Sequence, residues 1–160
     1  MAGFCKNAYC RLTAVGNCFQ SFLLLAMRLY WGGSFMLSGW GKWHHVSAIG
    51  DYFATLGIPF PLVNAYLVSS IECIGGICLL FGLASRLICI PLICVMMGAL
   101  LTEHRAALLN TLQDPEQLIA QLPFNYLLTA LIVFAFGPGK ISVDYLIERF
   151  CCHTSGESFD

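Results

Sequence analysis

The stretch LICIPLICVMMGALL, Leu87–Leu101, is apolar throughout and contains no charged residue. A hydrocarbon core about 30 Å thick is crossed by roughly 20 mostly apolar residues in a helix, and this stretch has room to extend outward. Three other segments have the same character: Phe19–Gly39, Leu62–Leu83 and Phe124–Phe136, the last lengthened backward through EQLIAQLP. They do not alternate as barrel strands do. The sequence therefore predicts an all-α integral membrane four-helix bundle with four transmembrane helices.

The composition agrees with a membrane protein. Of the 160 residues, 58% are hydrophobic and 11% are charged, whereas soluble domains carry about 25% charged residues. The net charge of −1 does not indicate binding to nucleic acid, which usually requires a basic surface. The first segment does not have the form of a cleaved signal peptide, because its apolar region is too long and three apolar segments follow it.

The basic residues predict the topology. We expect a cytoplasmic tail over residues 1–18, the membrane domain over 19–137, and an amphipathic or disordered cytoplasmic tail over 138–160. Cytoplasmic loops carry an excess of lysine and arginine, and the side of the two tails holds more basic residues than the other side. The tail side would carry Lys6, Arg11, Arg86, Lys140 and Arg149, and the opposite side Lys42 and Arg105.

The nine cysteines favour no disulfide framework. The two outer loops, residues 42–61 and 102–122, contain none, which suits free thiols on a reducing side. Three pairs share the spacing C-x4-C, but positions i and i+5 of a helix lie about 140° apart and cannot converge on one ion. We interpret the cysteines within the spans as small packing residues. The pair Cys151–Cys152 could be palmitoylated in a eukaryote.

Two ionisable residues lie deep within predicted spans, Arg28 and Glu72. A buried charge in a membrane needs a partner. Counted from the ends of their segments, the two residues differ in depth by about 3 Å at 1.5 Å per residue, so the sequence predicts a buried Arg28–Glu72 pair between adjacent antiparallel helices. Small residues share the same two faces, which permits close approach. The predicted pair has two alternative roles: it fixes the register of the two helices within the bundle, or it forms part of a polar ligand pocket.

The segment after the first span is predicted to lie at the outer membrane surface. Trp40 and Trp43 suit the interface, and Lys42 can extend to the head groups. Spacings of three and four residues predict a short amphipathic interfacial helix with an apolar face of Val46, Ile49, Phe53 and Leu56. His44, His45 and His104 lack the i, i+4 spacing of a helical metal site, so we predict no metal. His104 is a candidate contact for a quinone carbonyl.

Several of these stretches resemble the DoxX family of small integral membrane proteins. They are MRLYWGGSFMLSGWGKW, FATLGIPFP and ECIGGICLLFGLASR, and His104 also fits the pattern. The resemblance covers about Leu23 to Gly137. It implies a multi-pass inner-membrane protein and gives functional weight to Arg28, Lys42, Glu72 and Arg86. Lys42, His104 and Arg86 are the candidate contacts to a quinone or a head group.

The resemblance also implies an association with redox chemistry, because some members are linked to quinone-coupled sulfur oxidation and others to an oxidoreductase complex. No motif in the chain binds a redox cofactor, so a soluble partner would supply it. We identify no catalytic residue, and expect at most an accessory subunit of an oxidoreductase that binds a quinone. The alternatives are a non-catalytic scaffold or assembly factor, or a transporter of small solutes. A homo-oligomer is compatible with each of these.

Overall fold

The computed structural model describes residues 13, 16, 19–111 and 113–155. It is all-helical, with 83% of the residues in helices and no strand in the described part. Residues 19–44 form one continuous helix. The helix is α-helical over 19–27, π-helical over η1 (Arg28–Gly32), and α-helical again over α2 (Gly33–His44).

The remaining helices follow in the order α3 (Val46–Thr55), α4 (Pro61–Phe81), α5 (Ser85–Thr102), α6 (Arg105–Leu109), α7 (Pro115–Ile119), α8 (Leu122–Phe136) and α9 (Val143–Ser155). Of the described helices, α4 and α5 are long and apolar enough to cross a membrane, and α8 is apolar but shorter. Two of the four predicted segments are therefore helices that are capable of crossing a membrane, and the four transmembrane helices stay a prediction. Helices also form where the interfacial segment and the amphipathic tail are predicted, as α3 and α9.

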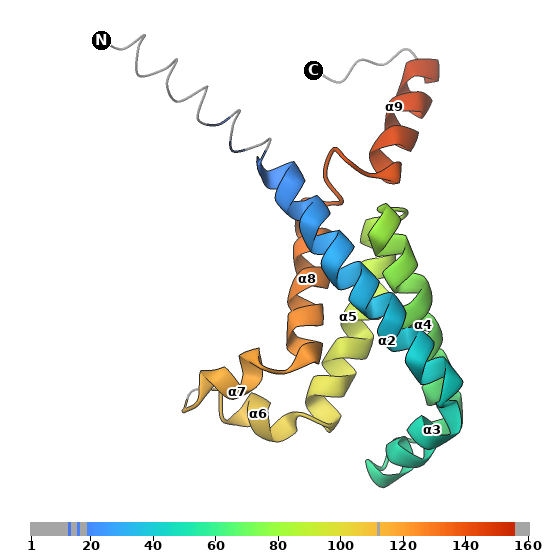
Figure 1. The fold of residues 1–160 in the computed structure, drawn as a ribbon, viewed down its shortest axis with the longest axis vertical. Helices are drawn as coiled ribbons and strands as arrows, with labels where there is room; N and C mark the ends of the chain where they lie inside the picture. Colours follow the sequence, from blue (N-terminus) through green and yellow to red (C-terminus); the bar gives the residue numbers. More distant parts are fainter. Residues whose placement is uncertain (1–12, 14–15, 17–18, 112, 156–160) are drawn as a thin grey trace.

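The long first helix crosses α4, and α5 and α8 complete the bundle (Figure 1). Helices α3, α6 and α7 lie at one end of this bundle, which we call the α3 end. Helix α9 lies at the opposite end, together with residues 19–27, and we call this the α9 end. Large apolar side chains are exposed along all of the long helices, as expected of a surface that faces lipid.

A seam of small residues joins α2 to α4. A Cβ added to Gly39 would lie 2.3 Å from the backbone nitrogen of Cys73, and one added to Gly76 would lie 2.3 Å from the backbone nitrogen of Met36. The two backbones are therefore in direct contact, as small residues permit in membrane helices. Next to this seam, the buried ring of Phe35 stacks on Tyr126 of α8 with a centroid distance of 4.1 Å.

The connection between α4 and α5 is tied to the C-terminal segment. Gly82 ends α4 in the left-handed conformation, with φ +69°, which glycine adopts without steric cost. Its carbonyl accepts a hydrogen bond of 3.0 Å from the backbone N–H of Asp144. The two carboxylate oxygens of Asp144 accept hydrogen bonds from the N–H groups of Ala84 and Ser85, at 2.6 and 2.8 Å. The start of α9 thus caps the start of α5.

Candidate functional site

The seam between α2 and α4 places two polar residues opposite Glu72. The Nζ atom of Lys42 lies 2.5 Å from Glu72 Oε1, and the Ser38 hydroxyl donates a hydrogen bond of 3.0 Å to Glu72 Oε2. Glu72 is 1% exposed, whereas the Lys42 side chain is 32% exposed. Both oxygens of the buried carboxylate therefore have a partner, as a charge in an apolar bundle requires.

This ion pair lies at the wall of a cavity of about 810 Å³ between α3, α4 and α5. The lining is mostly apolar and includes Ile49, Phe53 and Leu56, three of the four residues predicted to form the apolar face of α3. The volume is within the range of about 300–1,000 Å³ that is usual for small-molecule sites. An apolar pocket with a few polar groups on one wall suits a lipophilic molecule that carries a polar ring or head.

A second polar group lies where α3 meets the end of α5. Tyr52 and Glu103 both line the cavity, and the Glu103 carboxylate acts electrostatically on the Tyr52 phenol. Burial raises the pKa of the Tyr52 phenol above its ordinary value, and the Glu103 carboxylate raises this pKa further. At neutral pH the phenol is therefore protonated.

The predicted pair between Arg28 and Glu72 is wrong. Both residues are buried, each with 1% exposure, and the small-residue faces around them are buried as predicted. However, Glu72 binds Lys42 and Ser38, and Arg28 lies at the α9 end. There its Nη2 atom donates a hydrogen bond of 2.5 Å to the carbonyl oxygen of Ile141. Its Nε and Nη1 atoms have no hydrogen-bond partner among the described residues.

The error comes from the register of the two helices. The prediction counted depth from Phe19, but the first helix continues past the bundle at the α9 end (Figure 1). In the structure Gly39 lies against Cys73, and Arg28 lies against Gly82. Glu72 and Gly82 are ten residues apart on one helix, which corresponds to about 15 Å at 1.5 Å per residue. The two charges are therefore too far apart to pair.

The structure divides the other predicted site residues between the two ends. Lys42 was expected at the head groups and instead binds Glu72. His104 lies 3.8 Å from the Glu103 carboxylate, but it is not one of the residues that line the cavity. Arg86 lies at the α9 end, at the start of α5. Sequence reasoning missed Ser38 and the true role of Lys42, although Lys42 follows Phe35 by seven residues and therefore lies on the same helix face.

The sequence model of the DoxX family matches residues 23–105, more than half of the chain. The chain belongs to the DoxX family. The match includes Arg28, Lys42, Glu72, Arg86 and His104, and together with the two membrane-capable helices it identifies a membrane protein.

Two bacterial relatives extend over most of this DoxX-family chain. A Bacillus subtilis (strain 168) protein named "Putative oxidoreductase CatD" is 27% identical over 125 residues, which cover 78% of this chain and 87% of the relative. An uncharacterized protein of Haemophilus influenzae is 26% identical over 144 residues, which cover 88% of this chain and 91% of the relative. No solved structure gives a significant match.

Proposed function

We propose that this DoxX-family protein is a membrane subunit of a redox system that binds a quinone in the cavity beside Lys42 and Glu72. The observation that carries the proposal is the position of a buried, charge-paired carboxylate on the wall of a large apolar cavity. The name of the Bacillus subtilis relative, an oxidoreductase, supports a role in redox chemistry.

We also propose the topology that was predicted from the basic residues. The continuous helix of residues 19–44, α4, α5 and α8 are the four spans in an inner membrane, and the α9 end faces the cytoplasm. This end carries Arg86, Lys140 and Arg149, whereas the α3 end carries Lys42 and Arg105. The cavity then lies in the outer half of the bilayer.

The cavity residues fit a quinone. A quinone ring carries two carbonyl acceptors, and the Lys42 ammonium at the cavity wall has N–H donors beyond the one that Glu72 accepts. The apolar remainder of the wall suits an isoprenoid tail. Reduction of a bound quinone to the quinol takes up two electrons and two protons. The electrons would come from the cofactor of a soluble redox partner, and a partner at the α3 end would be nearest to the cavity.

Binding of decylubiquinone to the purified protein in lipid nanodiscs tests the proposal. The double variant Lys42→Met/Glu72→Gln removes both charges, so that neither is left buried without a partner. A hydrogen bond to a charged group is worth about 1.5–3 kcal/mol, so this variant should bind roughly 10- to 100-fold more weakly than wild type. Arg105→Gln, a change at the same end outside the cavity lining, should bind like wild type.

The results separate this function from the alternatives. If the double variant and wild type bind equally, the cavity beside Glu72 is not the quinone site. If wild type binds no quinone, a non-catalytic scaffold becomes the better description. A native-membrane pull-down then provides an independent measurement, because co-purification of an oxidoreductase would keep the redox association without the quinone.

A further inference from the structure

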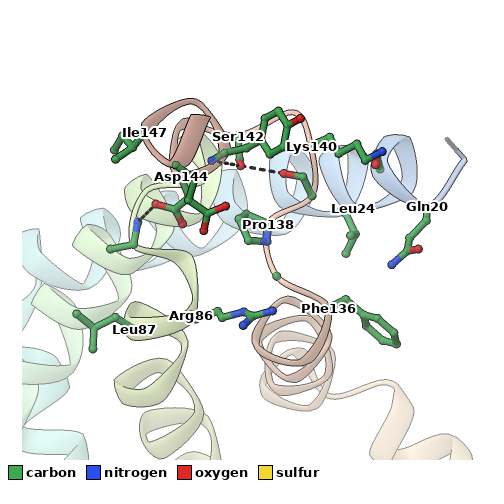
Figure 2. A pocket seen from close by; sticks show the side chains of 16 residues that line it. Gln20, Leu24, Arg86, Leu87, Phe136, Pro138, Lys140, Ser142, Asp144 and Ile147 are labelled. Carbon is green, nitrogen blue, oxygen red and sulfur yellow. Dashed lines mark hydrogen bonds between the residues drawn. The ribbon is translucent and has the colours of Figure 1, made fainter. Parts of the chain in front are cut away.

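A second cavity, of about 670 Å³, lies at the α9 end. It is an open cavity lined by the first helix, the start of α5, the segment 136–140 and α9 (Figure 2). The charged residues in its lining are Arg86, Lys140, Asp144 and Glu148. This cavity is at the opposite end of the bundle from Glu72, and the proposed quinone site does not use it.

Arg86 reaches across this cavity from α5 toward the end of α8 (Figure 2). Its guanidinium lies against the backbone of Gly137, where an added Cβ would be 3.3 Å from Nη2. Over residues 19–111 and 113–155, no ion pair joins Arg86 to an acidic side chain. The exposed guanidinium therefore has donors available for an anionic ligand.

The two acidic residues do not cancel the two cations. Both oxygens of Asp144 accept hydrogen bonds from the start of α5, and the carboxylate also interacts electrostatically with the buried Arg28. Its charge is therefore already compensated within the protein. Glu148 is exposed on α9. With Asp144 compensated and Glu148 offsetting one of the two cations, the cavity lining keeps one positive charge in excess.

The two cations lie where the apolar helices end. Arg86 is the second residue of α5, and Lys140 follows the end of α8. Leu87, the residue after Arg86, is 70% exposed, and Phe136, four residues before Lys140, is 63% exposed; both line the cavity. Positive side chains at the ends of spanning helices lie at the level of the phosphate groups, and apolar side chains next to them contact acyl chains.

We propose that this cavity binds the phosphate of an anionic phospholipid. Arg86 and Lys140 hold the phosphate, and Leu87 and Phe136 lie along the first part of an acyl chain. Arginine binds phosphate oxygens in a bidentate manner, and basic pockets between membrane helices recognise anionic head groups. The site requires that the bundle lies in a membrane but does not depend on the quinone. Only its assignment to the cytoplasmic leaflet rests on the proposed topology.

Native mass spectrometry of the full-length protein in detergent, with added phosphatidylglycerol, tests this site. Wild type should retain the lipid, and the double variant Arg86→Gln/Lys140→Gln should retain it at least tenfold more weakly. Arg86→Lys keeps the charge but loses the bidentate geometry, and should give an intermediate result. Arg149→Gln is the matched control, because Arg149 lies on the same end outside the cavity lining.

A thermal-shift measurement separates the sources of the phosphate. Phosphatidylglycerol should raise the midpoint of wild type more than phosphatidylcholine does, and 10 mM inorganic phosphate should leave it unchanged. An equal shift with inorganic phosphate would assign the site to a free anion, and an equal shift with phosphatidylcholine would remove the role of lipid charge. Equal lipid retention by wild type and the double variant would also overturn the proposal. The replaced side chains are exposed, so these variants should fold.

Discussion

Replacement of Gly39 by alanine tests the geometry that positions the ion pair. The new Cβ would lie 2.3 Å from the backbone nitrogen of Cys73 and 2.8 Å from its Cα, whereas ordinary contacts are at least 3.4 Å. Backbone atoms cannot rotate away as side chains do, so α2 and α4 must separate by about 1 Å near Glu72. A gap of this size forfeits about a quarter to a half of each dispersion contact. We expect the free energy of unfolding to fall by about 1–3 kcal/mol, as for other overpacked sites.

The assay is thermal unfolding of Gly39→Ala in detergent, with Gly41→Ala as the control. An added Cβ on Gly41 meets nothing within 4 Å, so this variant should unfold at the wild-type temperature or slightly above it, since alanine favours helix. Because Cys73 is adjacent to Glu72, Gly39→Ala should also weaken quinone binding. Equal midpoints for the two variants would show that α2 and α4 are not in backbone contact, and would refute the reasoning.

Three further predictions concern the two ends of the bundle. Gly82→Ala should destabilise the protein more than Gly57→Ala in thermal unfolding. Both positions have a positive φ, which costs alanine about 1–2 kcal/mol, but the new Cβ collides with Arg28 at Gly82 and meets nothing at Gly57. Asp144→Ala should cost about 1 kcal/mol of stability through the lost cap, and should speed proteolysis of the C-terminal segment. Because the pKa of Tyr52 is raised in the folded protein, the protonated phenol stabilises the fold fully below pH 10, and this stabilisation is lost as the pH rises further. Tyr52→Phe should therefore flatten the decline in thermal midpoint between pH 9 and pH 11.

The helices and their buried faces follow from the sequence because apolar runs and small residues are directly visible in it. Arg28, Phe35 and Gly39 share a face by their spacing, and each is buried. The partner of Arg28 could not be found in this way. Its acceptor is the backbone carbonyl of Ile141, and a carbonyl is present at every residue. No residue type therefore marks the acceptor in the sequence.

The sequence contains the information that identifies Lys42 as the partner of Glu72, but the prediction placed Lys42 at the head groups by a general rule. A lysine at the end of a span commonly extends to the head groups, and Lys42 fits that description. Lys42 lies instead on the face of α2 that contacts α4, and the register of these two helices places Lys42 next to Glu72. The cavity could not be predicted either, because it depends on the loop after α3, which turns that helix back against α4.

The hydrogen bond between Arg28 and Ile141 has a consequence for synthesis of the chain. The donor and the acceptor are separated by 113 residues, and the acceptor lies beyond the last long apolar helix. At about 5–20 residues per second, the ribosome needs roughly 6 to 23 seconds to make the intervening segment. During this interval the first helix cannot form its final contact at Arg28. The insertion machinery must therefore accommodate an arginine that acquires its acceptor only after 113 further residues have been made.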